Sequence, residues 1–136
     1  MPSTLRLLIV TPQGPMFSED VDMVTLPCVG GQIGIYPDHV PLITQMIPGE
    51  VIVEQQGRER FLAVGGGLVD ITADHVSILT DMAVAAESID EARAEEARQR
   101  AAARLAEKLS DEEVASVNAA LVRSLAQLQV KRRRRR

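Results

Sequence analysis

The sequence is poor in the residues that most often carry chemistry or stack on nucleic-acid bases. Its 136 residues include one cysteine, two histidines, one tyrosine, two phenylalanines and no tryptophan. One cysteine cannot form a disulfide within the chain, and two distant histidines do not make a ligand set for a structural metal. The sequence has almost no aromatic side chains on which nucleic-acid bases could stack. We therefore expect no disulfide framework, no metal site and no nucleic acid as a partner of the main body, and we expect Cys28 to be a small packing residue, buried or half-buried.

A hydrophobic run long enough to cross a membrane is also missing. The longest early apolar run, Leu7 to Val10, has four residues. A membrane-spanning helix needs about 20, and a signal peptide needs an apolar core of roughly 7 to 15. The sequence therefore predicts a chain that lies in the cytosol, whatever it later attaches to.

Positive charge is concentrated at the C-terminus. The formal net charge is −4, yet residues 131–136 are all basic. Without those six, the remaining 9 basic and 19 acidic residues give −10. A terminal block of like charge is typical of a disordered interaction tail. The acidic body is a poor binder of nucleic acid or anionic lipid.

The hydrophobic period divides the chain into two parts. From residue 5 to about residue 83, short alternating apolar runs are separated by turn residues, which is typical of antiparallel strands in a sandwich or barrel. Two hairpins are expected, with turns at Gln56-Gly57 and Ala73-Asp74. We predict an N-terminal antiparallel β-sandwich domain over residues 1–84.

From about Ser88 the sequence becomes rich in Ala, Glu and Arg and contains no Gly or Pro, as a solvent-facing helix requires. Ser88 and Glu91 have the spacing of a capping box, and Ser110 and Glu113 repeat it. We therefore predict a helix that begins at Ser88, a second helix that follows Ser110 and ends near residue 130, and together a C-terminal antiparallel two-helix hairpin in a domain over residues 85–136.

The apolar faces of these two helices are narrow. On the second helix we expect one buried stripe, made of Val114, Val117, Leu121, Leu125 and Leu128. The first helix offers mainly alanines, so the area that the hairpin buries is modest. We therefore expect the hairpin to be held weakly.

Two apparent motifs have simpler structural explanations. The triple glycine in "VGGGLV", Val64 to Val69, is followed by strand residues, whereas a nucleotide loop needs a helix start beneath the phosphates. Glycines at a bulge or a tight bend explain it better. His39 has no nucleophile or carboxylate at a recognisable spacing, and Pro37 and Pro41 stiffen its loop. We predict no catalytic residue, and we expect His39 to make a protein contact.

Six longer segments of the sequence together resemble a known protein family. In order, "VTPQGPMFSEDVDMVTLP", "GGQIGIYPDHVPLIT", "PGEV", "FLAVGGGLVDI", "VSILTDMA" and "IDEARAEEA" resemble the epsilon subunit of bacterial and chloroplast F-type ATP synthases. The resemblance implies a noncatalytic rotor subunit that forms the central stalk with the gamma subunit. It also implies a peripheral place, through the complex, on the cytoplasmic face of the cell inner (plasma) membrane.

The resemblance also implies where the sandwich docks. The segment from Gly31 to Ile35 matches the part of the family that lies against the membrane rotor ring of c subunits. Gly31, Gln32 and Gly34 would shape that docking edge. The position of His39 matches one that faces the gamma subunit.

The helical hairpin of the family can extend along gamma into the alpha/beta catalytic head and block ATP hydrolysis. Basic residues of the second helix then meet an acidic segment of beta, which here implies Arg123, Lys131, Arg132 and Arg133. Some family members also bind ATP in the folded hairpin. The matching residues are Ile89, Asp90, Arg93, Ala94, Arg100 and Arg123. No other cofactor is implied.

Alternatives from other classes remain at this stage. On spacing alone, Asp90, Arg93 and Arg100 are better explained as an ordinary salt-bridged helix. A small-molecule sensor would make ATP binding the main task of the hairpin. A nucleic-acid-binding module would depend on residues 131–136 alone, and its binding would collapse with salt.

Overall fold

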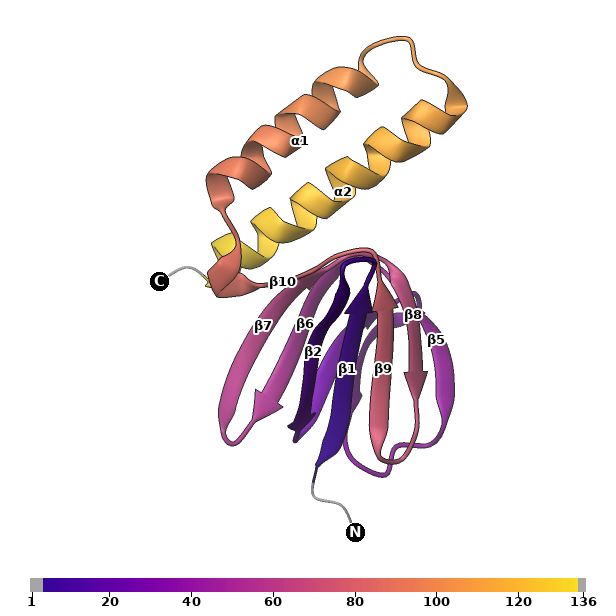
Figure 1. The fold of residues 1–136 in the computed structure, drawn as a ribbon, viewed down its shortest axis with the longest axis vertical. Helices are drawn as coiled ribbons and strands as arrows, with labels where there is room; N and C mark the ends of the chain where they lie inside the picture. The colour runs from indigo at the N-terminus through magenta and orange to yellow at the C-terminus, as the bar shows by residue number, and fades with distance from the viewer. Residues whose placement is uncertain (1–3, 135–136) are drawn as a thin grey trace.

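Strands fill the first part of the chain and two α-helices the second, in a computed structural model that describes residues 4–134 (Figure 1). The ten strands of these residues are β1 (Leu5–Thr11), β2 (Gly14–Val21), β3 (Met23–Cys28), β4 (Gly31–Ile35), β5 (Leu42–Met46), β6 (Gly49–Gln55), β7 (Arg58–Val64), β8 (Gly67–Ile71), β9 (His75–Thr80) and β10 (Ala83–Ala85). A 3-10 helix, η1 (Ala86–Ser88), leads to α1 (Glu91–Leu105) and α2 (Asp111–Arg134). The predicted fold class, a β-sandwich followed by a two-helix hairpin, is confirmed.

The strands form one sheet that folds over on itself. Its order is β10-β7-β6-β3-β5-β8-β9-β1-β2, and β4 pairs with β3 off this path. Neighbouring strands are antiparallel except β1 and β9, which pair in parallel from Arg6 opposite His75 to Val10 opposite Leu79. This pair is the one exception, among the described strands, to the predicted antiparallel arrangement. The two strands are far apart in the sequence, so no turn signal could indicate their direction.

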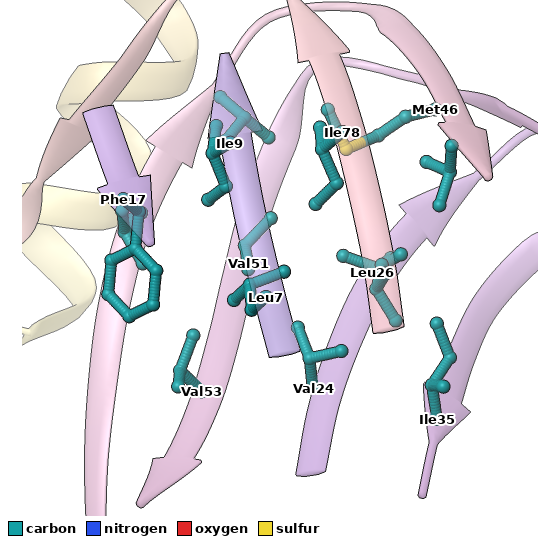
Figure 2. Close-up of a cluster of buried hydrophobic side chains, with 14 of the residues drawn as sticks. Leu7, Ile9, Phe17, Val24, Leu26, Ile35, Met46, Val51, Val53 and Ile78 are labelled. Atoms are coloured by element: carbon teal, nitrogen blue, oxygen red, sulfur yellow. The ribbon is translucent and has the colours of Figure 1, made fainter. Parts of the chain in front are cut away.

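The core lies between the two layers of the folded sheet (Figure 2). Alternate side chains of β1 point into it, and Leu5, Leu7 and Ile9 are at most 2% exposed. This alternation follows from the period of two along a strand. Cys28 is buried among these side chains, as predicted. Burial raises the pKa of its thiol, which leaves Cys28 an inert packing residue.

Both predicted hairpin turns are confirmed. Gln55 pairs with Arg58 across the first turn. Gln56 and Gly57 have φ values of 52° and 78°, the left-handed values that a type I′ turn requires. In the second turn, the Thr72 amide donates to the His75 carbonyl at 2.9 Å.

The start of the first helix differs from the prediction. Asp90 is the N-cap of α1, and its carboxylate accepts a hydrogen bond from the Arg93 amide at 3.1 Å. The predicted cap, Ser88, lies in η1 instead. Burial of Ile89 against the sandwich explains the shift, because it fixes the preceding residues before the helix begins. The box between Ser110 and Glu113 is confirmed, with two reciprocal hydrogen bonds of 3.2 Å.

The hairpin contacts the sandwich near the C-terminal end of α2, and its connecting loop projects away (Figure 1). A second apolar cluster forms this contact, made of Ala63, Ala86, Ile89 and Val130 with Phe61, Met82 and Val84 against it. The predicted stripe on α2 was partly wrong, because Val114 and Leu125 are 42% and 41% exposed. Only the last turns of α2 have the sandwich beneath them, so an apolar residue elsewhere on that helix can remain exposed.

Candidate functional site

The edge formed by β4 is open to solvent. Gly31, Gln32 and Gly34 are all exposed, and β4 pairs with β3. Gly31 has φ of 122°, and a Cβ built there meets nothing within 4 Å. Glycine at this position is therefore required by the backbone conformation and not by crowding. The strand presents a flat edge with little side-chain bulk.

This edge lies next to the last turns of α2. A pocket of about 250 Å³ is lined by Pro27, Cys28, Gly31, Gln32, Ile47, Gly49, Glu50, Gln129, Val130 and Arg133. Gly31 and Gln32 line it from the sandwich, whereas Val130 and Arg133 line it from the hairpin. A partner that docks on the β4 edge would therefore approach α2 as well.

His39 lies at the other end of β4. Its half-buried ring places Nδ1 2.6 Å from the Val40 carbonyl oxygen. The Asp38 amide donates to the Ala73 carbonyl at 2.7 Å, which ties this loop to the turn between β8 and β9. The structure therefore separates His39 from Gly31 and does not gather them into one site.

Sequence reasoning missed an exposed apolar row on the outer face of the sandwich. Ile43, Leu68 and Leu79 are 74%, 56% and 56% exposed. Leu68 pairs with Leu79. Its partner on β5 is Gln45, and Ile43 lies two residues before Gln45 on the same face of that strand. We call these three residues the apolar row. The signal in the sequence is one apolar residue at an outward position of each strand, Leu68 on β8 and Leu79 on β9, where a strand with one solvated face usually carries a polar residue.

Four of the proposed ATP-binding residues meet at one place on the hairpin. A pocket of about 300 Å³ is lined by Ser88, Asp90, Arg93, Ala94, Ala97, Arg100, Ser124 and Gln127. Arg93 and Arg100 are exposed there. Ile89 is 4% exposed and belongs to the second apolar cluster. The structure therefore places Asp90, Arg93 and Arg100 around one pocket and uses Ile89 for packing.

Arg123 is not part of that pocket. Its Nη1 lies 3.3 Å from Asp81 Oδ2, and it lines a neighbouring pocket of about 280 Å³. Gln127 lines both pockets. The structure thus connects Arg123 to the sandwich through Asp81, and leaves Arg93 and Arg100 as the cations of the hairpin pocket.

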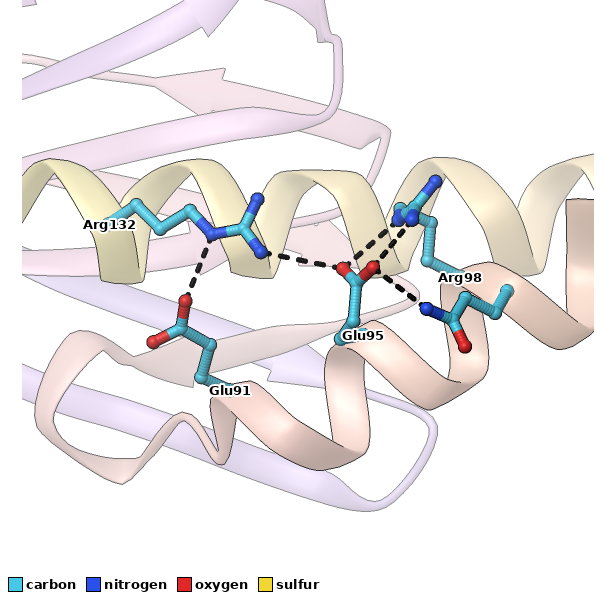
Figure 3. Close-up of polar contacts among 5 residues, drawn as sticks. Glu91, Glu95, Arg98 and Arg132 are labelled. Atoms are coloured by element: carbon cyan, nitrogen blue, oxygen red, sulfur yellow. Dashed lines mark hydrogen bonds and ion pairs between the residues drawn. The ribbon is translucent and has the colours of Figure 1, made fainter.

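A ladder of ion pairs joins the two helices (Figure 3). Arg132 of α2 binds Glu91 at 2.9 Å and Glu95 at 3.4 Å. Glu95 also accepts hydrogen bonds from Arg98 and Gln99. The bond from Arg98 is the main reason why the pKa of Glu95 falls to about 2. Glu95 therefore stays ionised at any physiological pH.

The basic end of the chain is ordered as far as it is described. Residues 131–134 continue α2, so the expectation of a disordered tail was wrong for them; residues 135–136 lie outside the described part. Lys131 donates to the Ala86 carbonyl at 3.3 Å. Arg133 and Arg134 both bind the Glu50 carboxylate, which is 8% exposed. Acidic partners from α1 and β6 let the helix continue through a block of like charge.

Residues 4–134 hold neither a metal-binding cluster nor a membrane-spanning helix. No group of three or more His, Cys, Asp or Glu side chains in this range could hold a metal ion. No helix in the same range is long and apolar enough to span a bilayer.

Comparisons with known families match both parts of the chain. The family model described as the beta-sandwich domain of the ATP synthase delta/epsilon chain matches residues 4–86. The model described as the long alpha-helix domain of the same chain matches residues 87–132. Together the two matches cover most of the sequence in the order that the fold shows.

Similar proteins and structures agree with these matches. A protein named ATP synthase epsilon chain from Alkalilimnicola ehrlichii is 41% identical over 135 residues, which cover 98% of this chain and 96% of that protein. One of the same name from Bacillus subtilis is 40% identical over 111 residues, or 82% and 84% of the two chains. A chain in the Euglena gracilis mitochondrial ATP synthase structure (OSCP/F1/c-ring, rotational state 1) aligns with a TM-score of 0.76 at 23% identity, covering 95% of this chain and 81% of that one. At this identity the structural match shows a shared fold.

Proposed function

The chain belongs to the ATP synthase delta/epsilon family as an epsilon chain, a noncatalytic subunit, and from this membership we propose that it couples the catalytic head to the membrane rotor ring. Its partners would be the gamma subunit, the c subunits of the ring and, in an inhibited state, the alpha/beta head. It would lie on the cytoplasmic face of the cell inner membrane as a peripheral part of the complex.

The observation that carries the docking role is the apolar row. Large apolar side chains exposed in a contiguous line across strands are typical of a surface that another protein covers. We assign this surface to gamma, together with His39. The loop of His39 is fixed by the bond from Asp38 to Ala73, so the imidazole is presented from a rigid position.

The β4 edge suits the ring. Gly31, Gln32 and Gly34 are exposed and carry little bulk, so a polar loop of a partner can approach the backbone closely. The edge lies on β4 and the apolar row on β5, β8 and β9, so one subunit could hold the ring and gamma through different strands.

Gly31→Glu is expected to weaken retention of the c subunits by about 1–2 kcal/mol of binding, as the loss of one central interface position does. The added side chain places a bulky carboxylate on the flat edge, where the partner would otherwise approach the backbone. The measurement is the amount of c subunit that co-purifies with the assembled complex, together with coupled ATP synthesis.

Gly57→Glu is the matched control for that variant. Gly57 also has a positive φ, 78°, with open space around a built Cβ, and it lies in the turn between β6 and β7 away from the β4 edge. It adds the same charge at another positive-φ glycine, whose φ lies nearer the left-handed region open to L residues than the 122° of Gly31 does. Equal retention of c subunits by the two variants would remove the β4 edge from the ring interface.

The hairpin is proposed to switch between two positions. In one it lies on the sandwich, as observed. In the other it extends along gamma, and Arg123, Lys131, Arg132 and Arg133 meet an acidic segment of beta and block ATP hydrolysis. The small apolar cluster beneath α2 supports this, because little buried area has to be given up and the two states can lie close in free energy.

A second candidate role, ATP sensing, is favoured by the pocket that Asp90, Arg93 and Arg100 line. Two guanidinium groups beside a pocket on the folded hairpin suit a phosphate chain. Bound ATP would then stabilise the folded hairpin by mass action.

Arg93→Gln or Arg100→Gln is expected to lower ATP affinity about tenfold or more, because each removes a charge-assisted hydrogen bond to phosphate. Calorimetry on the isolated chain measures this directly. Arg104→Gln is the control, since Arg104 is an exposed cation of the same helix that pairs with Glu113. No heat from the unaltered chain at roughly millimolar ATP would end the sensing hypothesis.

A further inference from the structure

We propose that the last turn of α2 is a latch that clamps the hairpin onto the sandwich, with Glu50 of β6 as its fixed point. We call Glu50, Phe61, Arg133 and Arg134 the Glu50 latch. The basic end of the chain then stabilises the docked hairpin through contacts within the same chain. This role is separate from any contact that the same cations make with a partner.

The geometry of the latch is that of a strong ion pair. Arg134 donates from Nη2 to Glu50 Oε1 at 2.6 Å and from Nε to Oε2 at 2.9 Å, in a bidentate arrangement. Arg133 adds a third bond to Oε1 at 3.3 Å. The guanidinium of Arg134 also lies 3.8 Å from the centre of the Phe61 ring. Bidentate contacts between arginine and carboxylate are among the strongest side-chain hydrogen bonds, and the ring adds a cation–π contact.

The latch differs from the other ion pairs of the hairpin in what it connects. Arg132 binds Glu91 and Glu95, which belong to α1. Those pairs move with the hairpin and do not resist its release. Glu50 belongs to β6, so its bonds to Arg133 and Arg134 must break when α2 leaves the sandwich. Glu50 is 8% exposed, so water screens its pairing with Arg134 less than it screens a pair on the open surface.

The apolar contact beside the latch has few fully buried residues. The cluster beneath α2 has four buried members, of which two are alanines: Ala63, Ala86, Ile89 and Val130. One further ion pair, between Arg123 and Asp81, crosses the same interface, but both of its side chains are more than a third exposed. Such an exposed pair contributes little. Of the ion pairs between α2 and the sandwich, the Glu50 latch is therefore the stronger, and its loss should make the hairpin open more often.

The test uses the isolated full-length chain and amide hydrogen exchange. Exchange at the last turn of α2 reports how often that segment opens. Glu50→Gln is expected to speed exchange there about tenfold, because it removes the charge from three hydrogen bonds. Amides of β1 and β9 serve as the folding check and should exchange as before.

Glu54→Gln is the matched control. Glu54 lies on the same strand, near the turn at the other end of β6 and opposite Glu59, so the variant removes the same charge from the sheet away from α2. A third variant combines Arg133→Gln with Arg134→Gln. Adding Glu50→Gln to this variant should not speed amide exchange at the last turn of α2 any further. Equal exchange in Glu50→Gln and Glu54→Gln, or full additivity with the double arginine variant, would overturn the latch.

A second measurement tests the latch and the proposed inhibition separately. The effect of the latch on the enzyme rests on that proposed inhibition. In the assembled complex, Glu50→Gln should lower ATP hydrolysis several-fold, because a released hairpin spends more time extended while keeping every cation that would meet beta. Faster exchange with unchanged hydrolysis would leave the latch standing and contradict the inhibitory role. Unchanged exchange rejects the latch whatever the hydrolysis rate.

Discussion

Removal of residues 110–136 is expected to raise ATP hydrolysis by the assembled enzyme several-fold while the rotor stays attached. The deletion removes α2, and with it Arg123 and every cation proposed to meet the acidic segment of beta. The sandwich, which carries the apolar row, His39 and the β4 edge, remains. Its main core is built from side chains of the strands, so the docking surfaces should survive the loss of α2.

The measurement is steady-state hydrolysis over a range of salt concentrations, with co-purification of gamma and c subunits as the check on attachment. The control is a chain that lacks only residues 135–136, which leaves all described contacts of α2 in place. Salt should reduce the difference between full-length and truncated enzymes, because exposed charges are screened. Equal rates at every salt concentration, with attachment intact, would exclude an inhibitory hairpin in this protein.

The truncation and the Glu50→Gln substitution are expected to change the rate of ATP hydrolysis in opposite directions. Truncation at residue 110 takes away the inhibitory element itself, so hydrolysis rises. Glu50→Gln keeps that element and removes only its docking partner, so hydrolysis falls. Opposite effects from two changes to the same device are hard to explain by general destabilisation, which would push both variants in the same direction.

Local sequence signals predicted the parts of the fold that depend on neighbouring residues. The turn at Gln56-Gly57 needs left-handed backbone, which glycine adopts freely at Gly57, and it formed as expected. The capping box at Ser110 satisfies orphan amides within one helical turn, and it formed too. The change of hydrophobic period separated strands from helices for the same reason, since period is a property of short windows.

Features set by distant contacts could not be predicted. The parallel pair of β1 and β9 depends on how the sheet closes. Residues 131–134 are helical because Glu50, Glu91 and Glu95 face them across the fold, and Glu50 lies more than 80 positions away. Arg123 reaches Asp81 for the same kind of reason. In the candidate site, Asp90, Arg93 and Arg100 line one pocket because the N-cap and the first turns of α1 hold them at helical spacing, and ATP binding there stays a prediction.

Gly67→Ala is expected to destabilise the sandwich by about 3 kcal/mol or more, at the upper end of overpacking costs. A Cβ at Gly67 would overlap the Leu79 carbonyl oxygen and approach Thr80 Cα to 3.0 Å. These are backbone atoms of β9, paired with β8, so they cannot move aside without opening the sheet. At Gly65, by contrast, the added Cβ would meet the carboxylate of Asp81, a side chain that can rotate away.

Gly30→Ala is the matched control for Gly67→Ala, because a Cβ there meets nothing within 4 Å and the backbone is not left-handed. Its free energy of unfolding should lie within about 1 kcal/mol of the unaltered chain. Denaturant unfolding of the isolated chain measures both variants. A large loss for Gly67→Ala beside a small one for Gly30→Ala would assign the last glycine of "VGGGLV", at the start of β8, to close approach between strands. Equal losses would mean that the sheet relaxes around an added methyl group, and the structural explanation of this glycine would fail.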